Sequence, residues 1–513
     1  YPLTPLQQGM LFHSLYEPES KIGYEQMTCL LEGELDVAAF ARAWAAVVQR
    51  HTILRTAFVW EGVKEPLQVV RRQVELPLQQ EDWRGEINQE QRLREFLKAE
   101  RERGIDLGHA PLMRLSLLRL ADEIYQLVWS RHHLLLDGWS RPLLMKEVLS
   151  LYDAFRKGEQ LELSPARPYR EYIGWLQKQD QQAAEQYWRQ QLQGLQQGTE
   201  LVRSVGRERV AADEERYGLV TRHLSAESSA GLQVLCREQK LTMNTVLQGA
   251  WAVLLSRYTG QGEVVYGAVV AGRPAELMGV EQMVGLFINT LPVRVKVVGN
   301  ERVSRWLQQL QAAQVEMRQY EFSPLAQVQQ WSEVSGGQSL FETLLAYENY
   351  PVAQSLQAGD RGAEGGLRVQ AVEVWERSNY PLAVVVMPGE ELRIELTYER
   401  ERFADESMER LGTHLLTILE ELGSGRREQV GAVEMLTAAE RRQLREEWNA
   451  TAAEYPQERC IHQLIEEQVE RTPEAVALRF NEEQLSYAQL NSRANQLAHY
   501  LRASGVGPEV VVG

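Results

Sequence analysis

The sequence predicts an α/β fold of two lobes, and the order of its elements carries this prediction. In the first half, segments with apolar residues at helical spacing flank a run rich in strand-forming residues. The second half follows a similar order, because a strongly apolar helix at residues 245–258 precedes a strand at residues 263–270. No internal sequence repeat accompanies this order, so the prediction of two lobes depends only on the order of the predicted helices and strands. The length of 513 residues leaves room for a further unit.

Capping residues mark the helices of the first half. Thr4, which is followed by proline, begins a helix that continues over residues 6–16. Asp36 begins a second helix with its apolar residues on one face. Ser140 begins a third helix, which Gly158 ends.

The second half begins with a glutamine-rich segment at residues 177–197. Trp188 and Leu192 lie at helical spacing within it, which favours a solvated helix over disorder. Beyond residue 445 a linker is followed by a helix, a strand, a turn and a long helix. The sequence therefore divides into a first lobe at residues 1–175, a second lobe at 176–445, a linker at 446–458 and the start of a separate domain at 459–513.

Composition argues against several classes of protein. The formal net charge of -16 at pH 7 disfavours nucleic acid as a partner, because phosphate binding needs a surplus of lysine and arginine on one face. No apolar run is long enough to cross a bilayer, and there is no secretory leader, so no membrane partner is expected. Because the chain starts at Tyr1 rather than methionine, we expect a fragment of a longer protein. Three cysteines without metal-ligand or disulfide spacing predict buried free thiols in a reducing cytoplasm: Cys29, Cys236 and Cys460.

The segment richest in reactive side chains follows a strand predicted at residues 124–129. It reads His132-His133-Leu134-Leu135-Leu136-Asp137-Gly138-Trp139-Ser140 and ends where the third helix begins. Loops at such junctions often hold functional residues. An imidazole accepts a proton near neutral pH, Asp137 can pair with a cation, and Gly138 lets a substrate approach the backbone. Adjacent histidines at a strand end are, however, often only hydrogen-bonded core or surface residues.

The pattern His132-His133-x-x-x-Asp137-Gly138 resembles the signature of condensation domains of nonribosomal peptide synthetases, which are similar in fold to chloramphenicol acetyltransferase. Six further segments resemble the ordered motifs of this family, in the same order, over about residues 1–445. The second motif has Thr52 where glutamate is usual, and the fourth and sixth motifs are loose matches. The six segments are residues 4–12 (TPLQQGMLF), 50–58 (RHTILRTAF), 169–175 (YREYIGW), 284–294 (VGLFINTLPVR), 321–325 (EFSPL) and 378–382 (SNYPL).

This resemblance implies both a fold and an activity. The fold would be two chloramphenicol acetyltransferase-like lobes in a V-shaped pseudo-dimer, with the active site in the tunnel between them. The activity would be peptide-bond formation, an acyltransferase reaction in which an acceptor aminoacyl-carrier amine attacks a donor carrier thioester. The partners would be upstream donor and downstream acceptor peptidyl carrier domains, which bring 4'-phosphopantetheine. We expect no cofactor and no metal to bind this fragment itself.

The resemblance also implies roles for individual residues. His133 is expected to carry catalysis, either as a general base or by orienting the amine and stabilising the tetrahedral intermediate. His132 is expected to be held by hydrogen bonds beneath the site. Asp137 is expected to pair with Arg294 and so brace the loop from the second lobe, and Arg55 is expected to give structural support. Without the resemblance, either arginine would be interpreted as a surface charge.

Three further residues are candidate substrate contacts. Trp139 and Ser140 follow the histidines, and Asn289 lies in the fifth motif, where a cap or turn role is equally consistent. The order Trp139-Ser140 resembles peptide-forming rather than epimerising domains. Residues 6–15 resemble domains that take an L-configured donor, so we expect L-donor to L-acceptor condensation. The alternatives are an epimerisation-type relative and an inactive platform that only docks carrier proteins, which the intact histidine motif disfavours.

The tail resembles a different family. Residues 485–490 (LSYAQL) resemble the first motif of adenylation domains, and residues 462–466 fit the entry helix of that family. The glycine- and threonine-rich phosphate loop of adenylation domains is absent from this sequence. We therefore expect an adjoining adenylation domain as a partner, and no amino-acid-dependent ATP–pyrophosphate exchange by this chain.

Overall fold

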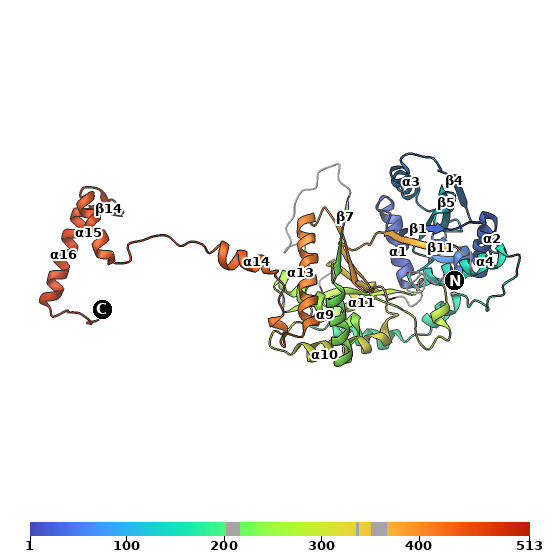
Figure 1. Ribbon diagram of the computed structural model, residues 1–513. Coiled ribbons are helices and arrows are strands. Elements are labelled where there is room, and N and C mark those ends of the chain that lie inside the picture. Colours follow the sequence, from blue (N-terminus) through green and yellow to red (C-terminus); the bar gives the residue numbers. More distant parts are fainter. Residues whose placement is uncertain (202–215, 335–337, 350–366, 513) are drawn as a thin grey trace. The chain divides into compact units, whose positions relative to one another are not determined.

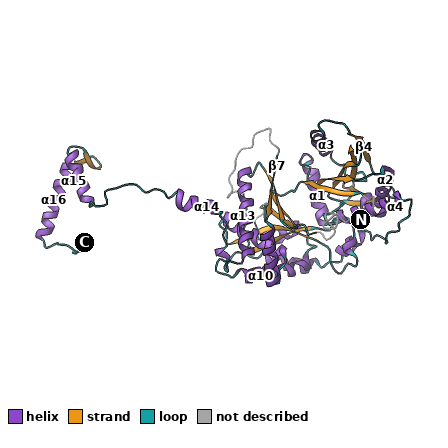
Figure 2. Cartoon of the chain, viewed as in Figure 1, coloured by secondary structure: helices purple, strands orange, loops and turns teal. Residues whose placement is uncertain are grey.

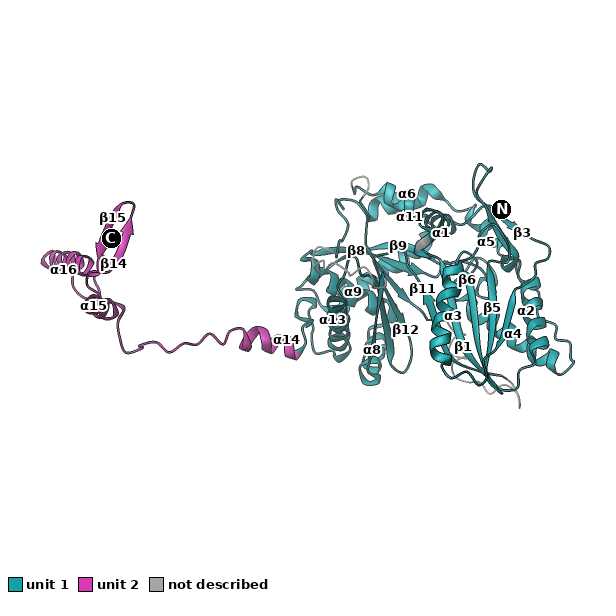
Figure 3. Ribbon diagram, turned by 90° about the horizontal axis from the view of Figure 1, so that it is seen from above, with its two compact units in different colours: residues 1–437 teal, residues 438–513 magenta. Residues whose placement is uncertain are grey.

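Two compact units make up the chain in the computed structural model, which describes residues 1–201, 216–334, 338–349 and 367–512. The first unit is Tyr1–Thr437 and the second is Ala438–Gly513 (Figure 3). The first unit contains both helices and strands throughout (Figure 2), which confirms the predicted α/β class. In this described part of the chain, no helix combines the length and the apolar character needed to cross a membrane.

The first lobe is built on a sheet of five strands, in the spatial order β11 (Arg368–Glu376), β1 (Tyr24–Glu32), β6 (Ile124–His132), β5 (Met113–Ala121) and β4 (Leu78–Asp82). The pairs β11–β1, β1–β6 and β6–β5 are antiparallel, and β4 runs parallel to β5. The expected strand at residues 124–129 is confirmed as β6, which continues to His132.

Helices cover both faces of this sheet. Side chains alternate between the faces along a strand, so Trp129 packs edge-on against Trp44 while its neighbour Val128 packs with Trp83 and Leu118 on the other face. The first face is covered by α2 (Val37–Arg50) and α4 (Ser140–Arg156), and the second by α3 (Gln89–Arg103). The expected helices after Asp36 and from Ser140 are thereby confirmed.

The second lobe is built on a mixed sheet of six strands, in the spatial order β7 (Tyr217–Leu224), β13 (Leu392–Glu399), β12 (Leu382–Met387), β10 (Thr343–Tyr347), β8 (Glu263–Val270) and β9 (Asn289–Lys296). β10 runs parallel to both of its neighbours, and the other pairs are antiparallel. The sheet shares one core with α8 (Ala226–Gln239), α9 (Met243–Thr259) and α13 (Asp405–Ser424). Every residue of α9 from Thr245 to Leu255 is buried, which explains its strongly apolar sequence.

Further helices and strands complete the first unit. The threonine cap of α1 is confirmed, because Thr4 and Gln7 form a reciprocal capping box. The glutamine-rich segment forms α6, which Asp180 caps and which buries Trp188, so the expected helix is confirmed there. These elements are α1 (Pro5–Tyr16), η1 (Pro18–Ser20), η2 (Thr52–Arg55), β2 (Thr56–Val59), β3 (Leu67–Val70), α5 (Arg170–Leu176), α6 (Gln181–Gln191), η3 (Val280–Gln282), α10 (Val303–Met317), η4 (Arg318–Tyr320), α11 (Leu325–Trp331) and η5 (Val430–Ala432).

The strand β11 departs from the predicted division of the lobes. It lies in the second half of the sequence, yet it pairs with β1 of the first lobe, with Glu376 opposite Glu25. Figure 1 shows it in yellow-orange beside the blue β1. Apolar residues of β11 occur at both alternating positions, Val369 and Trp375 on one side and Val372 and Val374 on the other, so its sequence has no one-sided pattern that would reveal the sheet to which it belongs. The second unit also begins at Ala438, before the linker predicted at residues 446–458.

The second unit contains the helix, the strand, the turn and the long helix that the sequence predicts, and a second strand, β15, that was not predicted. After α14 (Ala438–Arg442) and a π-helical turn η6 (Gln443–Glu447), it contains α15 (Ile461–Arg471), a hairpin of β14 (Val476–Phe480) and β15 (Glu483–Ser486), and α16 (Tyr487–Ala503). The hairpin turns at Asn481, which has a positive φ of 52°.

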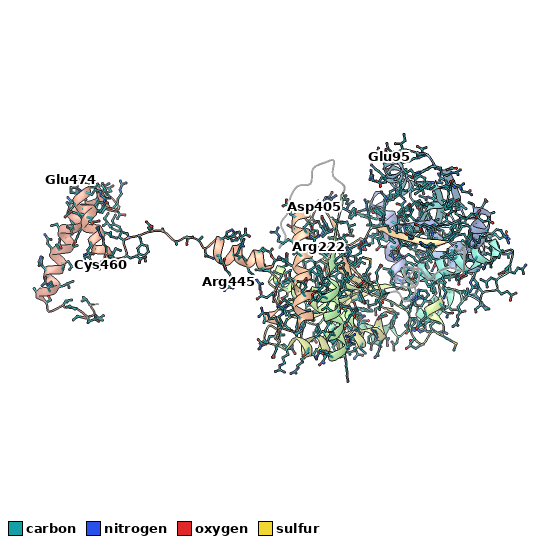
Figure 4. All side chains as sticks on the ribbon, viewed as in Figure 1. Glu95, Arg222, Asp405, Arg445, Cys460 and Glu474 are labelled. Carbon is teal, nitrogen blue, oxygen red and sulfur yellow. The ribbon has the colours of Figure 1, made fainter. Side chains whose placement is uncertain are left out.

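The three cysteines differ in burial. All of them are free thiols, but Cys29 is buried, Cys236 is half-buried and Cys460 of the second unit is exposed (Figure 4). The expectation of buried thiols is therefore confirmed for Cys29 and wrong for Cys460, which lies directly before α15.

Candidate active site

Two strands place the histidine pair. β6 ends at His132, which lies opposite Tyr24 of β1. The amide of His133 then donates a hydrogen bond of 2.7 Å to the carbonyl of Gly23. The chain turns from there into α4, so the motif lies between a strand and a helix as its sequence predicts.

His132 is a buried, neutral imidazole. Its Nδ1 accepts a hydrogen bond of 3.2 Å from the amide of Leu134, so its proton is on Nε2, which lies 3.2 Å from Oγ of Ser14. Burial, together with the nearby charge of His133, lowers the pKa of His132 to about 3. A Cβ at Gly23, whose φ is +80°, would lie 2.7 Å from Cε1 of His132. These contacts hold the ring of His132 in one orientation within the fold.

We predict that His132 makes the protein less stable as the pH falls. The unfolded chain protonates this ring near its ordinary pKa, about 6.5, whereas the folded protein keeps it neutral down to about pH 3. Stability is therefore lost progressively as the pH falls below about 6.5. The drop in melting temperature between about pH 7.5 and about pH 5.5 should be smaller in His132→Asn than in the wild type, since asparagine does not titrate. Equal drops in the two proteins would contradict this prediction.

His133 lies at the edge of the buried region, with 16% of its side chain exposed. Its Nε2 lies 3.4 Å from Oε1 of Glu25, and its Nδ1 is buried without a hydrogen-bond partner among the described residues. Glu25 and Arg131 form a buried ion pair between β1 and β6, where the two residues lie directly opposite each other. An ionised carboxylate therefore lies beside Nε2 of His133.

A second carboxylate lies beside Glu25. Oxygen atoms of Glu25 and Glu376 and a ring nitrogen of His133 all lie within 4.8 Å of one another. Burial opposes the charge of Glu25, but Arg131, followed by His133, outweighs it and lowers the pKa of Glu25 to about 2. Desolvation by the surrounding protein, followed by the charges of Glu25 and Glu348, raises the pKa of Glu376 to about 7. Because Arg131 already neutralises Glu25, we assign no metal site to this cluster.

Asp137 anchors the loop that follows the histidines. Its buried carboxylate accepts hydrogen bonds from the amide and the hydroxyl of Ser140, at 2.9 and 2.7 Å, and from the amide of Phe287 at 3.1 Å. Arg273 completes the set, with Nη2 at 3.1 and 3.2 Å from the two carboxylate oxygens. The guanidinium of Arg273 also lies 4.0 Å from the ring centre of Phe287. This network fixes the loop to the segment between β8 and β9.

The predicted pairing of Asp137 with Arg294 is wrong. Arg294 instead binds Glu263 through two hydrogen bonds of 2.9 Å. The reason is the length of the strand: β9 begins at Asn289, and five residues of extended chain carry Arg294 about 17 Å beyond that point. Arg273 takes the role instead, and this residue was not predicted from the sequence. The available signal was its position between a glycine and a proline, just beyond a predicted strand.

The remaining predicted residues differ in accessibility. Gly138 is buried, and the buried hydroxyl of Ser140 is bonded to Asp137 as described above. Asn289 donates hydrogen bonds of 2.8 Å to two backbone carbonyls, and the buried Arg55 likewise donates to backbone carbonyls. Nε1 of Trp139 donates to a backbone carbonyl at 3.0 Å, but its ring is partly exposed. Of the three predicted substrate contacts, Trp139 is the one that a substrate could reach.

Comparison with known families decides the identity of the first unit. Residues 1–445 match the Condensation domain family. The chain belongs to this family. Residues 465–513 match a second family, the AMP-binding enzymes, so the condensation domain is followed by the start of another domain, as the sequence predicts.

The curated relatives of this condensation domain are much longer proteins. The chain is 46% identical over 515 residues to one of the subunits of linear gramicidin synthase from Brevibacillus parabrevis, and 36% identical over 515 residues to tyrocidine synthase 2 of the same organism. All of the chain is covered in both comparisons. It spans 7% of the first relative and 14% of the second.

Solved structures share the fold of the condensation domain. The first condensation domain of the calcium-dependent antibiotic synthetase, in complex with a substrate analogue, matches with a TM-score of 0.70 at 18% identity over 85% of this chain and 99% of that chain. The X-domain in the complex of the X-domain and OxyB from teicoplanin biosynthesis matches with a TM-score of 0.68 at 23% identity, over 85% of this chain and 96% of that chain. These likenesses confirm the predicted fold family.

Proposed function

We propose that this condensation domain forms a peptide bond between two carrier-bound substrates. The observation that carries the proposal is the placement of His133, an accessible imidazole whose Nε2 lies 3.4 Å from a buried carboxylate. The loop around it is fixed by the Asp137 network, which gives the preorganised geometry that catalysis requires. Membership of a family of amide-forming acyltransferases supports the same reaction.

The reaction joins the amine nitrogen of the acceptor to the thioester carbon of the donor. A C–N bond forms, a C–S bond breaks, the amine loses a proton and the departing thiolate gains one. His133 either takes the proton from the amine or orients the amine and stabilises the tetrahedral intermediate. The negative charge of Glu25 favours the first role, because it stabilises the imidazolium that forms.

The substrates of this reaction arrive on partner domains. An upstream donor and a downstream acceptor peptidyl carrier domain each bear a 4'-phosphopantetheine, whose thiol holds the aminoacyl or peptidyl group. The condensation domain needs no resident cofactor for this reaction, and Trp139 contacts the bound substrate. The match of residues 465–513 to AMP-binding enzymes supports an adjoining adenylation domain as the third partner. We place the reaction in the cytoplasm.

We predict that loaded donor and acceptor carrier domains, mixed with this chain, yield a dipeptidyl acceptor carrier. Mass spectrometry of the intact carriers would detect the transfer as the mass of one aminoacyl group. Because residues 6–15 resemble L-donor domains, an L-configured donor should react faster than its D-epimer. Equal or faster reaction of the D-donor would contradict the L-donor assignment and leave the condensation reaction intact. Conversion of the donor to its epimer without transfer would instead indicate an epimerisation-type relative.

A second candidate function is a platform that docks other proteins without catalysis. The structural likeness to an X-domain that is found in a complex with OxyB is the observation that favours it. The two functions separate in the carrier experiment: a platform binds loaded carriers but leaves their masses unchanged.

A further inference from the structure

Glu376 has no part in the function proposed above, yet it lies in the same cluster. Glu376, Glu25 and Arg131 lie opposite one another on three adjacent strands, so their side chains share one face of the sheet. Arg141 and Glu348, which form an ion pair of 3.7 Å, adjoin this row. Three carboxylates and two guanidinium groups therefore meet beside the imidazole of the proposed base.

The charges of this cluster favour retention of one proton. With all five groups ionised, the cluster would carry one net negative charge, and oxygen atoms of Glu25 and Glu376 would lie within 4.8 Å of each other with like charges. Glu25 keeps its charge because Arg131 is bound to it. Glu376 has no ion pair among the described residues, and its side chain is exposed to solvent. Glu376 is therefore the group that holds the proton and can exchange it with water.

We propose that Glu376 is a positioning residue that acts through His133: it holds a proton beside Glu25 and releases it when His133 becomes protonated. This inference rests on the proposed function, in which His133 takes a proton from the attacking amine. In that step the N–H bond of the amine breaks, an N–H bond forms at Nε2, and the carboxyl of Glu376 gives its own proton to water. The cluster keeps its net charge, so the positive charges of Arg131 and Arg141 do not oppose the new imidazolium.

The titration of His133 tests this coupling without any substrate. The ring can be followed by NMR in protein labelled with 13C-histidine, with its signal assigned by its absence from His133→Ala. Because an ionised Glu376 stabilises the imidazolium, Glu376→Gln should lower the titration midpoint of His133 by about one pH unit. Glu376→Asp, which retains a carboxyl group, should restore much of the shift. Glu373→Gln is the matched control, because Glu373 lies on β11 three residues away and so on the opposite face of the strand.

The pH dependence of stability provides a second readout. The folded protein keeps Glu376 protonated up to about pH 7, whereas the unfolded chain loses this proton at its ordinary, lower pKa. The wild type therefore loses stability as the pH rises through this window, and Glu376→Gln should lack that loss. Its melting temperature relative to the wild type should increase with pH, while Glu373→Gln follows the wild type. This comparison also shows whether the variant folds.

The outcomes separate this inference from the proposed function. An unchanged His133 midpoint in folded Glu376→Gln would overturn the inference, even if the wild type forms peptide bonds. A shifted midpoint in a wild type that transfers nothing would support the coupling and overturn the proposed function. If both hold, Glu376→Gln should reduce kcat by about tenfold with little change in KM, and should alter the pH profile of kcat near neutrality.

Discussion

Replacing His133 by alanine should reduce dipeptide formation by at least about 10²-fold, the lower range for the loss of an acid–base group. Nδ1 of His133 is buried without a hydrogen-bond partner among the described residues, and removal of this unsatisfied atom offsets part of the packing that alanine would lose. The melting temperature should therefore stay close to that of the wild type. The measurement is the rate of carrier-to-carrier transfer in single-turnover mass spectrometry, alongside thermal unfolding of both proteins.

Two controls make the His133 result specific. Ile87→Ala changes an exposed side chain in the same lobe, outside the motif segments, and should leave the fold and the transfer rate unchanged, which controls for handling of the variant. Acceptors with unactivated, poorly nucleophilic amines should show the largest loss, because they depend most on removal of the proton. If His133→Ala kept near-normal turnover with such acceptors, His133 would not be the catalytic residue.

Asp137→Ala should cost on the order of 3–5 kcal/mol of stability, as expected when one partner of a buried ion pair is removed. The side chains of Asp137 and Arg273 are 0% and 4% exposed, so Arg273 would be left buried without its counterion. The loop that carries His133 would also lose its anchor, so transfer activity should fall with stability. Asp137→Asn is the milder variant, because it retains an oxygen to accept the hydrogen bonds of Ser140.

A double-mutant cycle distinguishes the true partner of Asp137. The double variant Asp137→Asn, Arg273→Met should lose clearly less unfolding free energy than the two single variants lose in sum, since the ion pair is lost only once. In the matched cycle with Arg294→Met, the losses of unfolding free energy should add, because Arg294 binds Glu263 rather than Asp137 and lies at a more exposed site. Urea or thermal unfolding measures both cycles. Strong coupling of Asp137 to Arg294, with none to Arg273, would contradict the network described here.

Local patterns were sufficient to predict several of the helices. The caps at Thr4 and Asp36 and the strongly apolar sequence of α9 depend on residues close in sequence, and all three helices appear in the structure as expected. The histidine motif was placed correctly for the same reason, because a strand and a helix of clear composition flank it. Hydrogen bonds and apolar spacing within one element need no knowledge of the remaining chain.

The tertiary partners could not be predicted in this way. Arg273 and Arg294 both lie near motif residues, and only the path of β9 decides which of them reaches Asp137. Glu25 and Glu376 were missed altogether, because they are far apart in sequence and meet only through the pairing of β11 with β1. A glutamate in an exposed strand resembles any solvated side chain until the opposite strand is known.

The pairing of β11 with β1 has a consequence for how the chain folds as it is synthesised. The edge of β1 that β11 covers stays unpaired until residues 368–376 leave the ribosome. At translation rates of roughly 5–20 residues per second, the interval between the synthesis of the two strands is roughly 20–70 s. An exposed strand edge can pair with other chains, so this interval is a period of risk for misassembly. The sheet of the first lobe therefore cannot be completed until β11 has been synthesised, and by then most of the second lobe has been synthesised too.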